Sequence, residues 1–71
     1  MERKIRSFEA LGSNHRTIAI DEWQSFVVVA AGGTTAYMPG VTRFSANGGP
    51  VRRLDERTFS LLLTGETVEV I

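Results

Sequence analysis

The chain has 71 residues, a length that forms one small domain, residues 1–71, with a thin core and little room for an enclosed active site. Eight basic and eight acidic side chains cancel, so the protein as a whole has no strong field that would draw it onto nucleic acid or an anionic membrane. The sequence has no cysteine and a single histidine, which excludes disulfides and the usual zinc sites and leaves self-association as the simplest further source of stability.

The N-terminal residues carry charge but lead into no uninterrupted apolar segment, and no stretch approaches the roughly 20 apolar residues of a membrane span. We therefore expect a soluble cytoplasmic protein with no membrane partner.

A β-hairpin is expected at the N-terminal end. Residues 4–11 fit a helical stripe as well as a strand, but the turn cluster Gly12-Ser13-Asn14 and the alternating β-branched residues 17–20 favour two strands. His15 lies in this turn, where a lone histidine without a second ligand or a nearby serine nucleophile is typically solvated.

The middle of the chain holds an apolar, strongly β-prone run at residues 26–31, which begins with Phe26, Val27, Val28 and Val29. Such a run aggregates when it is exposed at a sheet edge, so we expect either a central strand covered on both faces or part of a subunit interface. Trp23 precedes it at a polar interruption, residues 21–25. There it either caps the core with its indole N–H turned to water or anchors a partner.

Two glycine-containing breaks follow this run, Gly32-Gly33 and Pro39-Gly40. The residues between them are too few for a stable helix, so this region is predicted to be a loop or a short irregular strand.

The last third of the chain predicts three further strands. Asn47-Gly48 indicates a two-residue hairpin turn, which would place Phe44 opposite Val51 and Arg43 opposite Arg52. Beyond it, alternation assigns a common buried face to Phe59, Leu61, Leu63, Val68 and Val70. The fold class is therefore all-β, a small and highly twisted antiparallel sheet or open barrel of about five strands.

Several short motifs carry a resemblance: Phe8-Glu9-Ala10, Pro39-Gly40-Val41, Gly49-Pro50-Val51-Arg52-Arg53-Leu54-Asp55, Thr58-Phe59 and Thr64-Gly65-Glu66. Together they resemble a group of small uncharacterised proteobacterial proteins of similar length and strand order. The resemblance covers nearly the whole chain and implies a bacterial all-β domain of unknown function, with no catalytic residue to carry over.

The strongest functional signal is a cluster of arginines. Two guanidinium groups opposite each other on one sheet face destabilise it unless a carboxylate or an anionic partner lies between them. Glu66 or Glu69 would supply the carboxylate, while nucleic acid or an acidic protein surface would supply the partner. The candidate residues for an anionic partner are Arg43, Arg52, Arg53 and Arg57.

No nucleophile, base and oxyanion group can be named together, so we expect a protein that is not an enzyme and that uses no cofactor or metal. The first hypothesis is a non-enzymatic protein-interaction module that self-associates as a homodimer, with Trp23, Phe26, Val27, Val28 and Val29 at the interface. The alternative is a small β-barrel that binds nucleic acid through the arginines, with Phe44 and Tyr37 as stacking faces.

Overall fold

Strands account for most of the chain. The structure is a computed structural model that describes the backbone of residues 1–71 and the side chains of residues 1–13 and 15–71. Its elements in chain order are β1 (Glu2–Leu11), the 3-10 turn η1 (Ser13–His15), β2 (Thr17–Ala31), β3 (Thr34–Ala46), β4 (Gly49–Arg53), β5 (Thr58–Leu61) and β6 (Glu66–Val70). Each strand pairs antiparallel with the next, and β1 pairs with β6, which closes a barrel. The predicted all-β class is confirmed, with six strands instead of about five and a closed barrel.

The barrel encloses an apolar core built by alternation along the strands. Three phenyl rings, Phe8, Phe44 and Phe59, meet at one end of this core with ring centroids 5.0 to 6.3 Å apart. Tilted and edge-to-face contacts of this kind add to the stabilisation from apolar burial. The buried core side chains are Ala10, Ile18, Ile20, Ala46, Val51, Phe59, Leu61 and Val68.

The turn between β3 and β4 has the predicted geometry. Asn47 and Gly48 both have positive φ, 51° and 76°, as a two-residue hairpin turn requires. Phe44 consequently lies opposite Val51, as predicted. The N-terminal hairpin is confirmed as well, because β1 pairs with β2 across η1.

The predicted burial of Leu63 is wrong. β5 ends at Leu61, and the chain then turns, with Gly65 at φ 75° and its N–H bonded to the Leu61 carbonyl. Leu63 therefore lies in the turn and is 75% exposed, whereas Phe59 on the strand is 2% exposed. Alternation along the sequence identifies a buried face only as far as the strand continues.

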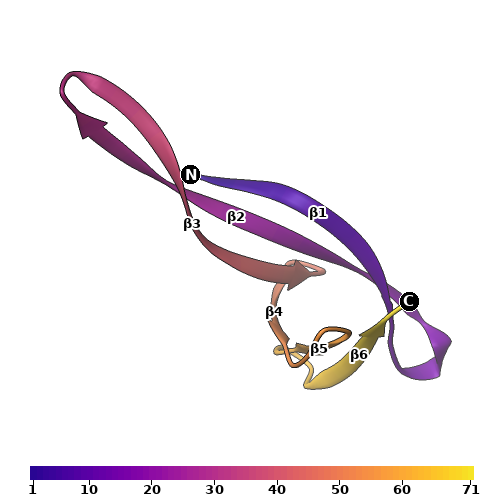
Figure 1. Cartoon of the computed structure of the whole chain (residues 1–71). Coiled ribbons are helices and arrows are strands. Elements are labelled where there is room, and N and C mark those ends of the chain that lie inside the picture. Colours follow the sequence, from indigo (N-terminus) through magenta and orange to yellow (C-terminus); the bar gives the residue numbers. More distant parts are fainter.

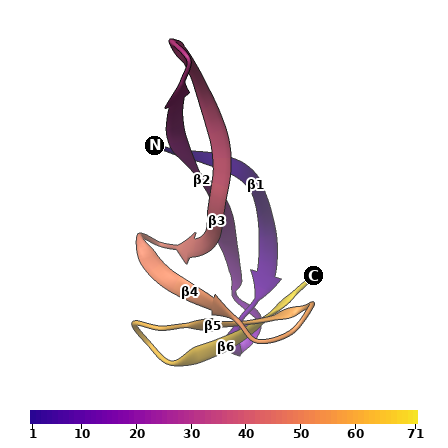
Figure 2. The same ribbon diagram turned by 60° about the vertical axis from the view of Figure 1, so that its left-hand side comes forward.

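The middle of the chain also differs from the prediction. β2 runs without a break through residues 21–25 to Ala31, and β3 starts at Thr34. The region predicted to be a loop or a short irregular strand is therefore part of a long hairpin. Gly32 and Gly33 form its turn with φ of 60° and 81°. This hairpin extends well beyond the barrel (Figures 1 and 2), which makes the molecule 55 Å long and 20 Å wide.

Glu66 at the start of β6 fastens η1 to the barrel. Its carboxylate accepts hydrogen bonds from the Ser13 N–H and hydroxyl, both at 2.7 Å, and from Arg16 at 2.9 Å. These bonds, the backbone N–H of Ser13 first among them, hold the pKa of Glu66 below its usual range.

A carboxyl whose pKa is lowered by folding stabilises the fold above its ordinary pKa, and this contribution is lost as the pH falls through the lowered value. We expect Glu66→Gln to lower Tm by a few degrees at pH 7 and to flatten the fall of Tm between about pH 5 and pH 3. Thermal unfolding followed by circular dichroism at each pH measures both effects. Glu69→Gln on the same strand is the control, and equal pH profiles for the two variants would contradict this role of Glu66.

Candidate interaction surface

The hairpin formed by residues 26–39 of β2 and β3, called the arm below, carries five large apolar side chains that are exposed. The arm extends beyond the barrel (Figure 1), and at its base Phe26 and Tyr37 line a hollow together with residues 1–3 at the start of the chain. Large apolar side chains on the arm remain 38 to 59% exposed, namely Val27, Val28, Val29, Tyr37 and Met38. Contiguous apolar exposure of this kind typically marks a surface that binds another molecule.

Both faces of the arm are apolar. Direct cross-strand partners share a face, so Val28 lies beside Tyr37 on one side and Val27 beside Met38 on the other. A hairpin with one apolar and one polar face can pack its apolar face on the core and expose the polar face to water. The arm has no polar face of this kind. It also has no charge, because residues 23–42 contain no charged side chain.

Of the two predicted roles of residues 26–31, the covered central strand is wrong. Within the chain this segment pairs with β3 alone, apart from the Phe26 N–H, which donates to the Met1 carbonyl at 2.8 Å. Val27 and Val28 are each 56% exposed. The other role, a subunit interface, stays a prediction.

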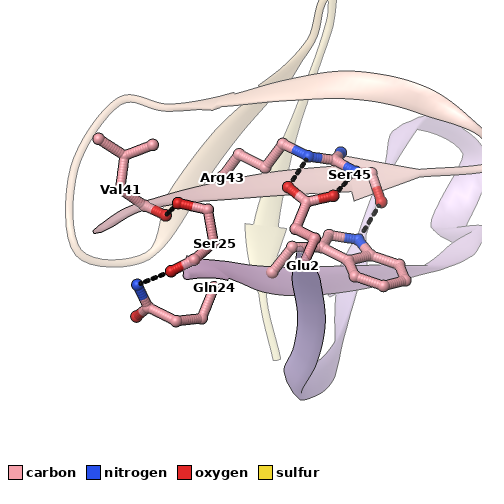
Figure 3. Close-up of polar contacts among 7 residues, drawn as sticks. Glu2, Gln24, Ser25, Val41, Arg43 and Ser45 are labelled. Atoms are coloured by element: carbon pink, nitrogen blue, oxygen red, sulfur yellow. Dashed lines mark hydrogen bonds and ion pairs between the residues drawn. The ribbon is translucent and has the colours of Figure 1, made fainter. Parts of the chain in front are cut away.

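A bulge marks the base of the arm. The register of β2 and β3 shifts between Gln24 and Phe26, so that Ser25 faces Gly40 and Val41 together. The Ser25 hydroxyl donates to the Val41 carbonyl at 2.9 Å, and the Gln24 amide donates to the Ser25 carbonyl (Figure 3). The same amide also donates to the Gly40 carbonyl. A Cβ on Gly40 would lie 2.7 Å from the Ser25 Oγ, so a side chain at this position would displace the hydroxyl that binds Val41.

Trp23 lies on the outer face of the sheet, just below the bulge. Its indole N–H donates to the Ser45 hydroxyl at 2.9 Å, so it is not turned to water as one of the two predictions had it. The ring is flanked by two cations, Lys4 at 5.7 Å and the Arg43 guanidinium at 5.4 Å from its centroid. These contacts hold Trp23 in place at the junction of arm and barrel.

Arg43 takes its partner from the N-terminal strand. Its guanidinium binds the Glu2 carboxylate through two hydrogen bonds, at 2.6 and 2.8 Å (Figure 3). This hydrogen bonding lowers the pKa of Glu2 and raises that of Arg43. The predicted pairing of Arg43 with Arg52 does not form, because the β3–β4 ladder ends at Phe44 and Val51. Neither predicted carboxylate, Glu66 or Glu69, is the one that Arg43 binds.

The four candidate arginines lie at different places on the molecule. Arg43 is on β3 and binds Glu2 of β1. Arg52 and Arg53 are adjacent on β4, so their side chains point to opposite faces of the sheet. Arg53 donates to the Asp55 carbonyl at 3.0 Å, and Arg57 donates to the Val70 carbonyl at 2.9 Å. The structure therefore shows contacts within the chain for three of the four.

Sequence reasoning missed a hollow at the end of the barrel nearest the arm. It has a volume of about 270 Å³ and its floor is formed by the phenyl rings of Phe8, Phe44 and Phe59. Arg6 and Arg53 lie at its rim, and Arg6 is held by Glu22 at 2.7 Å. Arg6 and Glu22 occupy the next inward positions of β1 and β2 beyond the core residues Phe8 and Ile20. A charged residue at such a position is the sequence feature that could have indicated this ion pair.

The structure also places two further features that the sequence singled out. Gly32 and Gly33, one of the two predicted breaks, form the turn of the arm, and β3 starts at Thr34. His15 is exposed in η1. No group of three or more potential metal ligands forms among the described residues. No helix of the described chain is long and apolar enough to cross a membrane.

The fold and this surface define a small closed antiparallel barrel that carries an apolar two-stranded arm. Comparison of the chain with family models, with curated proteins and with solved structures gave no match. The predicted resemblance to small proteobacterial proteins stays a prediction.

Proposed function

We propose that this protein is a non-enzymatic protein-interaction module of the cytoplasm that self-associates through the arm. The single observation that carries the proposal is the arm itself, an uncharged hairpin with two exposed apolar faces. A two-stranded hairpin in water is marginally stable at best, and it becomes stable when further strands or another surface cover it. Burial of the arm against a partner removes this liability and provides the free energy of association.

The base of the arm supports the same role. The Ser25, Gln24 and Trp23 contacts, together with the Glu2–Arg43 ion pair, fix the direction in which the hairpin leaves the barrel. A rigid element loses less conformational entropy on binding than a flexible one. These contacts therefore hold the arm in one direction relative to the barrel before it binds, which lowers the entropy cost of association.

Nucleic-acid binding has less support. The arginines that would contact phosphates are distributed over two strands and a turn, and Arg43, Arg53 and Arg57 bind oxygen atoms of the chain itself. The zero net charge gives no general attraction to a polyanion.

Sedimentation velocity at micromolar concentration tests the proposal. We expect the unaltered chain to sediment as a species larger than the monomer, with a concentration-dependent boundary, because the arms are buried against one another. The variant Val28→Lys, Tyr37→Lys places two charges side by side on one arm face and is expected to sediment as a monomer.

Leu63→Lys is the control for an added surface lysine, because Leu63 is even more exposed than the arm side chains but lies on a barrel turn. This control is expected to associate like the unaltered chain. An unaltered chain that remains a monomer throughout the concentration range would overturn the proposal, and so would association that survives the paired lysines.

A further inference from the structure

We infer that the arm pairs with the arm of a second copy of this chain, edge to edge through β2, to form one continuous four-stranded antiparallel sheet. This inference rests on the proposed function and adds the edge and the register of the pairing. It follows from which backbone groups of the arm point outward.

Hydrogen bonding in an antiparallel pair alternates, so each second residue turns its N–H and C=O away from its partner strand. Ala31 and Thr34 flank the two-residue turn and are bonded to each other. The next pair, Ala30 with Thr35, therefore points its backbone groups outward, and so do Val28 with Tyr37 and Phe26 with Pro39. The Phe26 N–H does point outward, because it donates to the Met1 carbonyl on the other side of β2.

The two outer edges of the arm are not equivalent. On β3 the outward residues include Pro39, which has no N–H and so weakens this edge as a template for a new strand. On β2 the outward residues beyond Phe26 are Val28 and Ala30, and each offers both a donor and an acceptor. The β2 edge is therefore the better site for strand addition.

A two-fold axis at Val29 gives the most complete pairing. It places Val28 of one copy opposite Ala30 of the other, and the reverse, which makes two doubly bonded pairs. An axis at Val28 would instead place Ala30, an outward residue, opposite Phe26, whose N–H already binds Met1, whereas the axis at Val29 places only the turn residue Gly32 there. An axis at Ala30 would place Val28 opposite Gly32 in the turn. In neither of these registers do the outward N–H and C=O groups of both Val28 and Ala30 find free partners in the other copy.

The second copy also fits by charge. The arm is uncharged, so no like charges meet when identical arms pair across a symmetry axis. At the axis Val29 meets Val29 of the other copy, which is a favourable β-branched pair. Four paired strands exceed the three that an independently stable sheet needs.

Cysteine cross-linking tests the edge and the register, since the chain has no cysteine of its own. In the proposed sheet the two Val29 Cα atoms form a non-hydrogen-bonded pair about 4.5 Å apart, within the range of a disulfide. Ala36 is the direct partner of Val29 within the arm and shares its face, but its two copies would lie three strand spacings apart, about 14 Å. We expect Val29→Cys to form a disulfide-linked dimer at least ~10-fold faster than Ala36→Cys under the same mild oxidant.

A proline pair provides a second readout without oxidation. Ala30→Pro and Thr35→Pro alter directly opposed residues, and each removes an N–H that points out of the arm and not one from its own ladder. We expect Ala30→Pro to weaken association at least ~10-fold and Thr35→Pro to weaken it less than ~3-fold. Far-ultraviolet circular dichroism and the thermal midpoint verify that both barrels are folded.

Equal cross-linking rates for the two cysteine variants, or a larger effect of Thr35→Pro than of Ala30→Pro, would overturn the β2 pairing. If association still required Val28 and Tyr37 in that case, the proposed function would stand and the arms would pack by their faces or by β3. A chain that does not associate at all would overturn both proposals.

Discussion

Replacement of residues 28–37 by Asn-Gly is expected to leave a folded barrel that no longer self-associates. Val27 and Met38 form a hydrogen-bonded pair of the same kind as Ala31 and Thr34, so a two-residue turn can join them directly. None of the enclosed core residues lies in the removed segment. The Tm of the shortened chain should therefore stay within about 5 °C of that of the unaltered chain.

Sedimentation velocity and thermal unfolding measure the two halves of this result. Gly32→Asn is the control, because it introduces the same Asn-Gly turn at the tip of a full-length arm and is expected to associate normally. A shortened chain that sediments like the full-length one would show that the arm is not the contact. A shortened chain that does not fold would show that the arm stabilises the barrel within one copy.

Phe59→Ala is expected to cause the largest loss of stability of any single core substitution. Phe59 is 2% exposed and its ring contacts both Phe8 and Phe44. Removal of a buried phenyl ring lowers the free energy of unfolding by about 3 to 5 kcal/mol. A domain of this length has a total of about 4 to 10 kcal/mol, so the variant should be largely unfolded or close to it at 37 °C.

Leu63→Ala is the comparison, since strand alternation assigns Leu63 to the same buried face as Phe59. It is 75% exposed, so its removal should lower the free energy of unfolding by less than about 1 kcal/mol. Urea unfolding followed by circular dichroism measures both values. Similar losses for the two variants would contradict the end of β5 at Leu61.

The parts of the fold that the sequence predicted are those controlled by local chemistry. Asn47-Gly48 determines both a turn and the register on either side of it, so Phe44 was correctly placed opposite Val51. Closure of the barrel was harder to predict, because β1 meets β6 through Ala10 and Leu11, nearly a whole chain length away in sequence. Local patterning contains no information about such a pairing.

The arm was not predicted because two sequence features that usually interrupt a strand do not interrupt one here. Pro39 suggested a break, yet its ring nitrogen faces outward from β3, where the arm loses no hydrogen bond of its own. The polar character of residues 21–25 suggested an interruption, but on β2 the two acids of this segment pair with cations of β1, Asp21 with Lys4 and Glu22 with Arg6. Tertiary partners replaced the apolar alternation expected of a strand.

The candidate surface was partly predictable. Residues 26–31 were identified by their apolar β propensity, while their partner strand, which contains Tyr37 and Met38, was missed together with the hairpin turn. The carboxylate that binds Arg43 was also missed. Glu2 lies 41 residues away in sequence and reaches Arg43 across two strand pairings, β1 with β2 and β2 with β3.

The lack of charge on residues 23–42 also has a kinetic consequence. Oppositely charged surfaces find each other at rates that reach about 10⁸ to 10⁹ M⁻¹ s⁻¹ and fall as salt is added, whereas uncharged ones meet at about 10⁵ to 10⁶ M⁻¹ s⁻¹ whatever the ionic strength. In the proposed association, encounters between arms would belong to the second class. The rate at which copies of this protein meet would then depend on their concentration and only weakly on the salt concentration.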